Sequence, residues 1–371
     1  MRRTEHSSSW QSKGYAHRLL SHRCCLYYCR NGYTVWSVKE GNIFVTSLEG
    51  KAMAVSNTTF VRPAKFYLSG FSNIPHVKYY YVFLCFVYIV TVIGNGLLLS
   101  VIYLVKTLHT PKYMIAFNLA LTDLCGSTAL IPKLLDTFLF DRRYIVYEAC
   151  LSYTFFVVFF GGVQSWTLVA MAYDRFIAIC FPLRYHSFVT TRVVAAMLLF
   201  TWIFLLGAVS FLVGIIDRLS FCGSLVIKSF FCDYGPVYSL ACNDKSLSYT
   251  VSFLIVTIIV FIPLILIAIT YVCISIALNR TASGEERLRA LKTCSSHLIL
   301  VAVVFLPIVG NKIASLASNI HPNARIINSS LTRTIPSFLN PIVYSLKTEE
   351  VLSAIKKLCK RNRLTNTTTK L

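Results

Sequence analysis

A few ionisable side chains interrupt the long apolar stretches of this 371-residue sequence. Asp123, Lys133 and Arg333 stand inside such stretches, and Asp174 with Arg175 closes another. A charge in an apolar segment is costly unless it has a partner or a task. The sequence contains no P-loop, no HExxH pair, no glycine-rich dinucleotide motif and no Cys/His cluster at metal-ligand spacing. We therefore predict binding and switching rather than catalysis: no enzyme, no catalytic residue and no resident metal.

The composition indicates which environment holds these residues. Hydrophobic residues make up 56% of the chain and charged residues 14%, whereas soluble domains carry about 25% charged residues. A net charge of +21 would suggest a nucleic-acid partner in a soluble protein. In so apolar a chain, the basic residues are expected beside membrane spans. We predict a lipid bilayer as the partner and no nucleic acid.

Seven stretches are long and apolar enough to cross a bilayer as helices. The predicted fold is an all-α membrane protein, a seven-transmembrane helix bundle followed by a short cytoplasmic amphipathic helix. The seventh stretch contains Arg333 and several Ser and Thr residues, so its polar face must lie inside the bundle. The predicted spans are 79–105, 113–139, 149–180, 193–216, 247–278, 290–316 and 325–346.

Charges, cysteines and a glycosylation motif predict the orientation. Counted from Met53 onward, the segments after spans one, three, five and seven carry more Lys and Arg than those on the other side, which places the N-terminus outside. Asn57-Thr58-Thr59 is a glycosylation acceptor on that side. Cys150, Cys222, Cys232 and Cys242 share it, and four thiols there suit two disulfides. We predict a multi-pass plasma-membrane protein with an extracellular N-terminus.

The ends of the chain differ from the apolar middle. Residues 1–52 form an atypical extension without a signal-peptide core, and two interpretations stay open: a non-native segment upstream of a start at Met53, or a genuine unusual leader. Residues 53–78 are predicted to be a glycosylated extracellular tail, 79–346 the seven-transmembrane domain, and 347–371 a cytoplasmic helix and tail. Within the last segment, Lys347–Lys360 reads as a basic amphipathic helix suited to an anionic membrane surface.

Motifs on five spans give a more specific identification. They are Gly94-Asn95, the LHTPKYM run 108–114, the MAYDRFIAIC run 171–180, the KTCSSH run 292–297 and the PSFLNPIVY run 336–344. Together they resemble the olfactory receptor branch of the rhodopsin-like (class A) G-protein-coupled receptors, from Met53 to about Cys359. The resemblance implies a receptor for a small-molecule odorant that activates a heterotrimeric stimulatory G protein and raises cyclic AMP. It also implies the disulfide pairs Cys150–Cys232 and Cys222–Cys242.

The resemblance further assigns switch residues and a polar core. The coupling and switch residues are Asp174, Arg175, Phe176, Asn340, Pro341 and Tyr344. Phe176 replaces the Tyr that is usual in the wider family. Pro341 removes a backbone hydrogen bond and lets the last span bend. Asn95 and Asn340 are the expected partners of Asp123, and this core either holds a sodium ion or is a purely structural contact.

The resemblance places the ligand among spans three, five, six and seven. The candidates are Val157, Val158, Gly161, Gly162, Phe253, Phe305, Ile308, Val309 and Arg333. Helix packing is the alternative role of the apolar ones. Arg333 either faces the cavity and favours anionic ligands such as carboxylates, or reaches outward to the membrane interface.

Two absences narrow the ligand class, and two rival functions stay open. Span three has no acid between Glu148 and Asp174, so a salt bridge to an amine ligand is not available. Span seven has no Lys before Lys347, so retinal cannot form a Schiff base. The rivals are a non-olfactory rhodopsin-like receptor and a membrane transporter. No internal repeat of the kind that transporters show supports the second.

Overall fold

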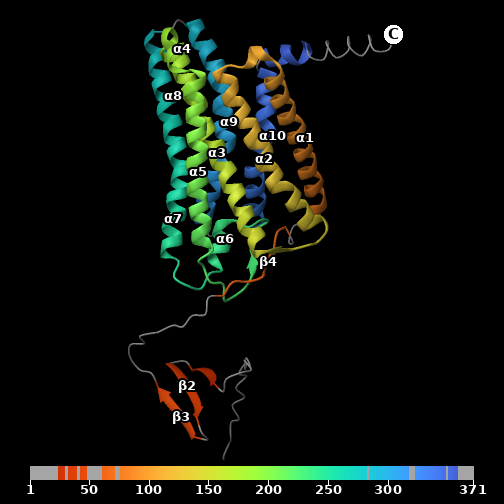
Figure 1. Cartoon of the computed structure of the whole chain (residues 1–371), viewed down its shortest axis with the longest axis vertical. Coiled ribbons are helices and arrows are strands. Elements are labelled where there is room, and N and C mark those ends of the chain that lie inside the picture. Colours follow the sequence, from red (N-terminus) through yellow and green to blue (C-terminus); the bar gives the residue numbers. More distant parts are fainter. Residues whose placement is uncertain are drawn as a thin grey trace, which may run out of the picture. The chain divides into compact units, whose positions relative to one another are not determined.

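The chain divides into two units, and each is described by itself. In this computed structural model the described residues are 24–29, 32–39, 42–47, 61–71, 76–281, 284–316, 322–347 and 350–357. The units are Met1–Thr59 and Phe60–Leu371. In the first, β1 (Cys24–Cys29), β2 (Gly32–Lys39) and β3 (Asn42–Ser47) form an antiparallel sheet in the order β1-β2-β3 (Figure 1). Aromatic and β-branched residues dominate these strands, as is usual in sheets.

Seven long helical segments make the bundle in the second unit (Figure 1). Their ends lie within a few residues of the predicted spans, because a long apolar run and its polar flanks fix a membrane helix. Pro111 opens the second helix, where its missing N–H costs nothing. The segments are α1 (Val77–Leu104), α2 (Pro111–Leu139), α3 (Tyr147–Cys180), α5 (Thr191–Ile216), α7 (Ser246–Val256) continued by the π-helical η3 (Thr257–Phe261) and α8 (Ile262–Thr281), α9 (Gly284–Leu316) and α10 (Pro322–Lys347).

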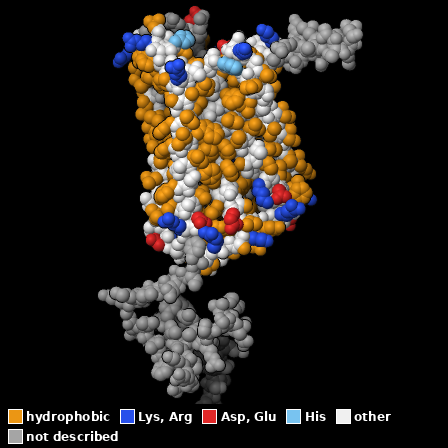
Figure 2. All heavy atoms as spheres, viewed as in Figure 1, with side chains coloured by type: hydrophobic (Ala, Val, Ile, Leu, Met, Phe, Trp, Pro, Cys, Tyr) orange, Lys and Arg blue, Asp and Glu red, His pale blue; other side chains and the backbone are white. Residues whose placement is uncertain are grey.

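The bundle has the surface of a multi-pass membrane protein. Among the described residues, six helical segments are long and apolar enough to cross a bilayer. The seventh, α10, is too polar to meet that criterion, and it buries Ser330, Thr334, Ser337 and Asn340. Figure 2 shows hydrophobic side chains over the middle of the bundle and charged ones gathered at its two ends. Lipid therefore replaces water around the middle, while the polar side of α10 is hidden among the other helices.

One end of the bundle, here called the disulfide end, carries a small sheet that the all-α prediction overlooked. Its central strand β4 (Lys65–Leu68) pairs antiparallel with β5 (Tyr144–Val146) and parallel with β6 (Val226–Ile227). Phe66 and Leu68 are buried beneath it. Gly70 has a φ of 53°, and a Cβ there would lie 1.9 Å from the Phe138 ring, so this turn requires glycine.

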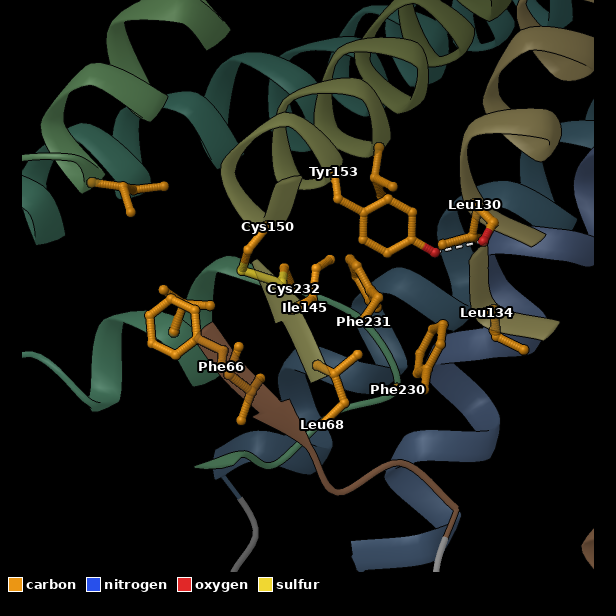
Figure 3. Close-up of a cluster of buried hydrophobic side chains, with 14 of the residues drawn as sticks. Phe66, Leu68, Leu130, Leu134, Ile145, Cys150, Tyr153, Phe230, Phe231 and Cys232 are labelled. Carbon is orange, nitrogen blue, oxygen red and sulfur yellow. Dashed lines mark hydrogen bonds between the residues drawn. A yellow bond between two sulfur atoms is a disulfide. The ribbon is translucent and has the colours of Figure 1, made fainter. Parts of the chain in front are cut away.

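Two disulfides hold the loop that runs across this end. Cys150 at the start of α3 is bonded to Cys232, and Cys222 to Cys242, the pairs that the resemblance implies. Figure 3 shows Phe231 beside the first bridge, facing the Tyr153 ring of α3. The two ring centroids are 6.0 Å apart in an edge-to-face arrangement, and the Tyr153 hydroxyl donates to the Leu130 carbonyl of α2 at 2.5 Å. The loop and its short helix α6 (Tyr234–Ser239) are thus anchored on α3 and α2.

The opposite end, here called the arginine end, contains Asp174 and Arg175. Short connections lie beside it: η1 (Lys106–Leu108), η2 (Pro182–Arg184) and α4 (Tyr185–Phe188). A helix over 350–357 buries Val351 and Ala354 and exposes Lys356 and Lys357. The predicted amphipathic helix is therefore described over these eight residues, with its apolar side packed on α1 and α2. Leu352, an apolar residue of the same helix, is exposed.

Candidate functional site

Asp123 lies at the centre of a buried polar core. Asn340 of α10 donates to its Oδ2 at 2.6 Å, and both Gln164 of α3 (2.6 Å) and Ser337 of α10 (3.1 Å) donate to its Oδ1. Three neutral donors from two helices therefore surround one carboxylate, which is how an acid can be kept inside a bundle. Asn340 was expected as a partner, whereas Gln164 and Ser337 were not.

Asn95 enters this core in a different way from the one expected. Its Nδ2 donates to the Ser337 carbonyl at 3.0 Å and to the Thr91 carbonyl at 2.9 Å, and it makes no direct hydrogen bond to Asp123. The Ser337 carbonyl needs this donor because its helical partner would be residue 341, which is proline and has no N–H. Gly94 allows the approach, since a Cβ there would lie 3.0 Å from the Pro341 ring. The Gly94-Asn95 motif thus stabilises α10 at Pro341, by a close approach at Gly94 and a hydrogen bond from Asn95.

The polar core also contains oxygens that could face a cation. Among the described residues, the buried side-chain oxygens without a hydrogen-bond partner are Asn95 Oδ1, Ser127 Oγ and Asn340 Oδ1. Carbonyl, hydroxyl and carboxylate oxygens are the ligands that hard cations prefer. These groups fit a small cation or water as the missing partner. No cluster of three or more His, Cys, Asp or Glu side chains suited to a transition metal occurs in the described parts of the chain.

Asp174 is enclosed at the arginine end, whereas Arg175 is partly open. The Asp174 Oδ2 lies 3.7 Å from the Arg175 Nε, and the Tyr185 hydroxyl of α4 donates to its Oδ1 at 2.7 Å. Burial, followed by the neighbouring Asp174 carboxylate, raises the pKa of Tyr185 above its ordinary value, so the phenol stays a donor. Phe176 packs in the core beside these residues, with its ring 5.7 Å from that of Phe181. Asp174 therefore contacts both Arg175 and Tyr185, and Tyr185 was not among the predicted site residues.

His297 joins three helices near this pair and was not among the predicted site residues. It is buried on α9, with its Nε2 3.1 Å from the Leu168 carbonyl of α3 and its Nδ1 2.8 Å from the Tyr271 hydroxyl of α8. Its place in the KTCSSH run was the available signal. A neutral imidazole can donate on one side and accept on the other. Any outward movement of α9 must break or exchange these two bonds.

A second proline joint lies in the segment that joins α7 to α8. The Ile262 N–H bonds to the Thr257 carbonyl, the spacing of a π-helix. In that register the Ile258 carbonyl points to residue 263, which is proline. The Trp166 indole of α3 donates to it instead at 3.1 Å. As at Ser337, a side chain from a neighbouring helix replaces the N–H that proline lacks.

The structure separates the four ligand candidates on α3 into two faces. Gly161 faces α10, since a Cβ there would lie 3.3 Å from the Arg333 Nη1. Val157, one turn earlier, is buried toward the disulfide end. Gly162 instead faces Leu205 of α5 and Ile259 of η3, both 3.2 Å from its notional Cβ, and Val158 packs in the same direction. Gly162 thus serves close helix packing.

The other apolar ligand candidates also lie in different parts of the bundle. Phe253 is 59% exposed on the outer surface of α7 and does not approach the others. Phe305 is buried in the core of the arginine half, and Ile308 packs at the edge of that core. Val309 is partly buried on α9. Phe253 is therefore left out of the ligand site proposed below, and Phe305 lies at its floor.

Arg333 points into the bundle rather than outward to the membrane interface. Its guanidinium lies beside Gly161 of α3, and its Cζ is 5.8 Å from the centroid of the Phe231 ring in the disulfide-bonded loop. Lys133, the other unexplained cation in a span, is paired with Asp136 at 2.8 Å. Two predicted sites lie outside the described residues: Asn57, and the side chain of Tyr344 on α10.

Comparisons with known proteins agree with this geometry. The family model described as "Olfactory receptor" matches residues 84–362. Olfactory receptor 1 of Rattus norvegicus is 33% identical over 311 residues, which are 83% of this chain and 98% of the relative. Olfactory receptor 5B12 of Homo sapiens is 36% identical over 295 residues, 79% of this chain and 93% of the relative. The crystal structure of squid rhodopsin matches the fold with a TM-score of 0.61 at 18% identity, covering 74% of this chain and 83% of that one.

Proposed function

Since the chain belongs to the olfactory receptor family and has a rhodopsin-like fold, we propose that it binds a small odorant inside the bundle and activates a stimulatory heterotrimeric G protein, raising cyclic AMP. It is a receptor and not an enzyme. It acts by favouring one packing of its helices over another through different ligand affinities for the two. No covalent step is involved.

The observation that carries this proposal is the arrangement of the arginine end. Arg175 is 21% exposed and reaches the surface, while its neighbour Asp174 is enclosed and tied to Tyr185. His297 links α3, α8 and α9 directly beneath. An outward shift of α9 would loosen these contacts and leave Arg175 free to contact a partner protein. Two discrete packings of one bundle are what a switch requires.

The odorant site is proposed to lie between α3, α9 and α10, beneath the disulfide-bonded loop. Val157 and Gly161 would line it on α3, Ile308 and Val309 on α9, and Arg333 on α10, with Phe305 as the floor. The inward direction of Gly161 and Arg333 supports this placement. A mostly apolar cavity with one polar group is the usual form of a small-molecule site.

The proposal also covers the orientation of the receptor in the membrane, its cellular location and a bound sodium ion. The disulfide end would be extracellular, since disulfides form in oxidising compartments. The arginine end would face the cytosol at the plasma membrane, and Asn57 would carry a glycan. A sodium ion would bind near Asp123 with Asn95, Ser127 and Asn340 supplying oxygens, a role that their unpaired oxygens support.

Cyclic AMP accumulation in cells that express the full chain with a stimulatory G protein tests the proposal. A panel of acids, esters, aldehydes, alcohols and amines should contain at least one agonist. Arg175→Ala should abolish its effect, whereas Arg192→Ala, an exposed arginine at the start of α5, should not. An agonist response that survives in Arg175→Ala would contradict the coupling role of Arg175. If the receptor reaches the cell surface and no compound of the panel raises cyclic AMP, the odorant role is contradicted.

A further inference from the structure

Arg333 lies inside the bundle, beside Gly161 of α3, and has no polar partner there among the described residues. Arg62, Lys133 and Arg143 each lie within 3 Å of a carboxylate oxygen. Within the described part of the chain, Arg333 has neither an ion pair nor a hydrogen bond. Asp233 acts on it electrostatically, but from beyond the 4.0 Å of an ion pair. A guanidinium in an apolar bundle is costly without an anion, so the fold keeps a cation whose partner is missing.

The groups beside Arg333 leave its N–H groups without an acceptor. On the α3 side the neighbour is Gly161, which has no side chain that could accept a hydrogen bond. On the disulfide side the guanidinium lies against the Phe231 ring, which attracts a cation but leaves its N–H groups unused. Phe231 is itself held by the Cys150–Cys232 bridge and the Tyr153 ring (Figure 3). A rigid ring thus fixes the position of the cation, while its N–H groups have no acceptor among the described residues.

Further polar groups stand one helical turn from Arg333 toward the disulfide end. Ser329 precedes it by four residues, so both lie on one side of α10. Asn311 of α9 donates to the Ser329 hydroxyl at 3.3 Å and accepts from Asn328 at 2.5 Å. Through Ser329, this amide–hydroxyl cluster lies on the same side of α10 as Arg333. It can supply neutral hydrogen bonds to an oxygen of a ligand that Arg333 attracts.

We propose that Arg333 anchors the carboxylate of a small, otherwise apolar ligand, so that the receptor prefers carboxylic acids to their esters. This inference rests on the proposed odorant site and names the ligand class. The guanidinium would donate two parallel N–H bonds to the two carboxylate oxygens, a geometry in which arginine exceeds other cations. The hydrocarbon part of the acid would lie along Val157 and Ile308.

The preference should be large, because an ester offers no negative charge to the partly buried cation. Hydrogen bonds to charged groups contribute about 1.5–3 kcal/mol, which corresponds to roughly ten- to hundredfold in affinity. A neutral ligand also leaves the Arg333 cation without a negative partner, which lowers its affinity further.

The experiment measures binding directly, without a G protein. The full chain, purified in lipid nanodiscs, is heated with hexanoate, octanoate, benzoate or the methyl ester of each. At least one acid should raise the Tm, and its ester should need at least about tenfold more ligand for the same shift. Arg333→Gln should remove the acid effect. Arg325→Gln, which deletes an exposed arginine from the first turn of the same helix, should keep it.

A second variant keeps the inference testable if Arg333→Gln does not fold. Gly161→Ala leaves the arginine in place but sets a methyl group 3.3 Å from its Nη1, so the acid shift should weaken while any ester shift persists. Equal effects of acid and ester on the wild type, no acid effect on the wild type, or an undiminished acid effect in Arg333→Gln would each overturn the inference. None of these results bears on G-protein coupling, which the Arg175→Ala experiment tests separately.

Discussion

Asp123 and Arg333 are two charges inside the same bundle, and their surroundings are opposite. Asp123 accepts hydrogen bonds from Asn340, Gln164 and Ser337. Arg333 lies against a ring and a glycine and has no hydrogen bond among the described residues. A charge that the protein satisfies by itself holds helices together. A charge that the protein leaves unsatisfied is available to an external ion. The first arrangement builds the bundle, and the second gives it a ligand preference.

The largest expected effect comes from removing each charge in turn. Asp123→Leu leaves three buried donors without an acceptor, each costing about 1–3 kcal/mol, so the free energy of unfolding should fall by at least about 3 kcal/mol. Arg333→Leu removes a cation that lacks a partner and should change stability by less than about 1 kcal/mol, or increase it. Thermal unfolding of both purified variants without ligand checks this. Equal losses of unfolding free energy in the two variants would contradict the contrast between Asp123 and Arg333.

The next effect concerns the bend beside Asp123. Asn95→Ala removes the donor to the Ser337 carbonyl and should cost about 1–3 kcal/mol. Pro341→Ala supplies a backbone N–H to the same carbonyl, so Asn95→Ala should cost about 1 kcal/mol less in that background. A double-mutant cycle of unfolding free energies measures the coupling. Strict additivity would mean that Asn95 does not compensate for the proline.

A third charge, Glu350 on the C-terminal helix, is paired but exposed and should therefore have a smaller effect. Hydrogen bonding from Tyr113, assisted by the nearby Lys112, lowers the pKa of the Glu350 carboxyl. Since the folded pKa is the lower one, its contribution is complete above the ordinary value of about 4.3 and disappears as the pH falls through the folded value. Hydrogen exchange of residues 350–357 should rise below about pH 4, relative to Glu350→Gln at the same pH. Identical exchange in both at pH 4 and pH 7 would contradict this pairing.

The smallest effect is expected from the N-terminal unit. Residues 1–52 belong to the other unit of the chain, so we expect their deletion to leave the Tm and the acid preference unchanged. Deleting residues 1–71 is the matched control. It removes β4 with the buried Phe66, Leu68 and Phe71 and should lower the Tm. A fall in Tm with the shorter deletion would show that residues 1–52 support the bundle.

The sequence predicted the helices well because apolar runs with polar flanks determine membrane spans. It also predicted that Asp123 and Asn340 would meet, since each is a polar residue stranded in an apolar helix. Gln164 and Tyr185 were missed, because a polar residue on a helix gives no sign of which neighbour it will reach. The pair Gly161 and Gly162 shows the same limit. Adjacent residues point about 100° apart on a helix, and only the packing of α3 against α5 and α10 tells which one faces Arg333.

The proline compensations could have been anticipated only in part. Pro263 and Pro341 each free a carbonyl, at residues 258 and 337, and a donor had to be found for both. The motif residue Asn95 supplies one donor, although the sequence predicted it as a partner of Asp123. Trp166 was not predicted, because its indole reaches Ile258 across the π-helical turn, and that turn is not visible in the apolar run. The sheet at the disulfide end was missed for a similar reason, since β4 has four residues and β6 two.

The most direct test of the contrast between the satisfied and the unsatisfied charge is nucleotide exchange on a stimulatory G protein by the reconstituted full-length receptor. Wild type and Arg333→Gln are titrated with an acid that stabilises the wild type and with its methyl ester. In the wild type, the acid should stimulate exchange at a concentration roughly tenfold or more below the one that the ester requires. In Arg333→Gln this difference should vanish. The same acid-to-ester ratio in both receptors would contradict the account.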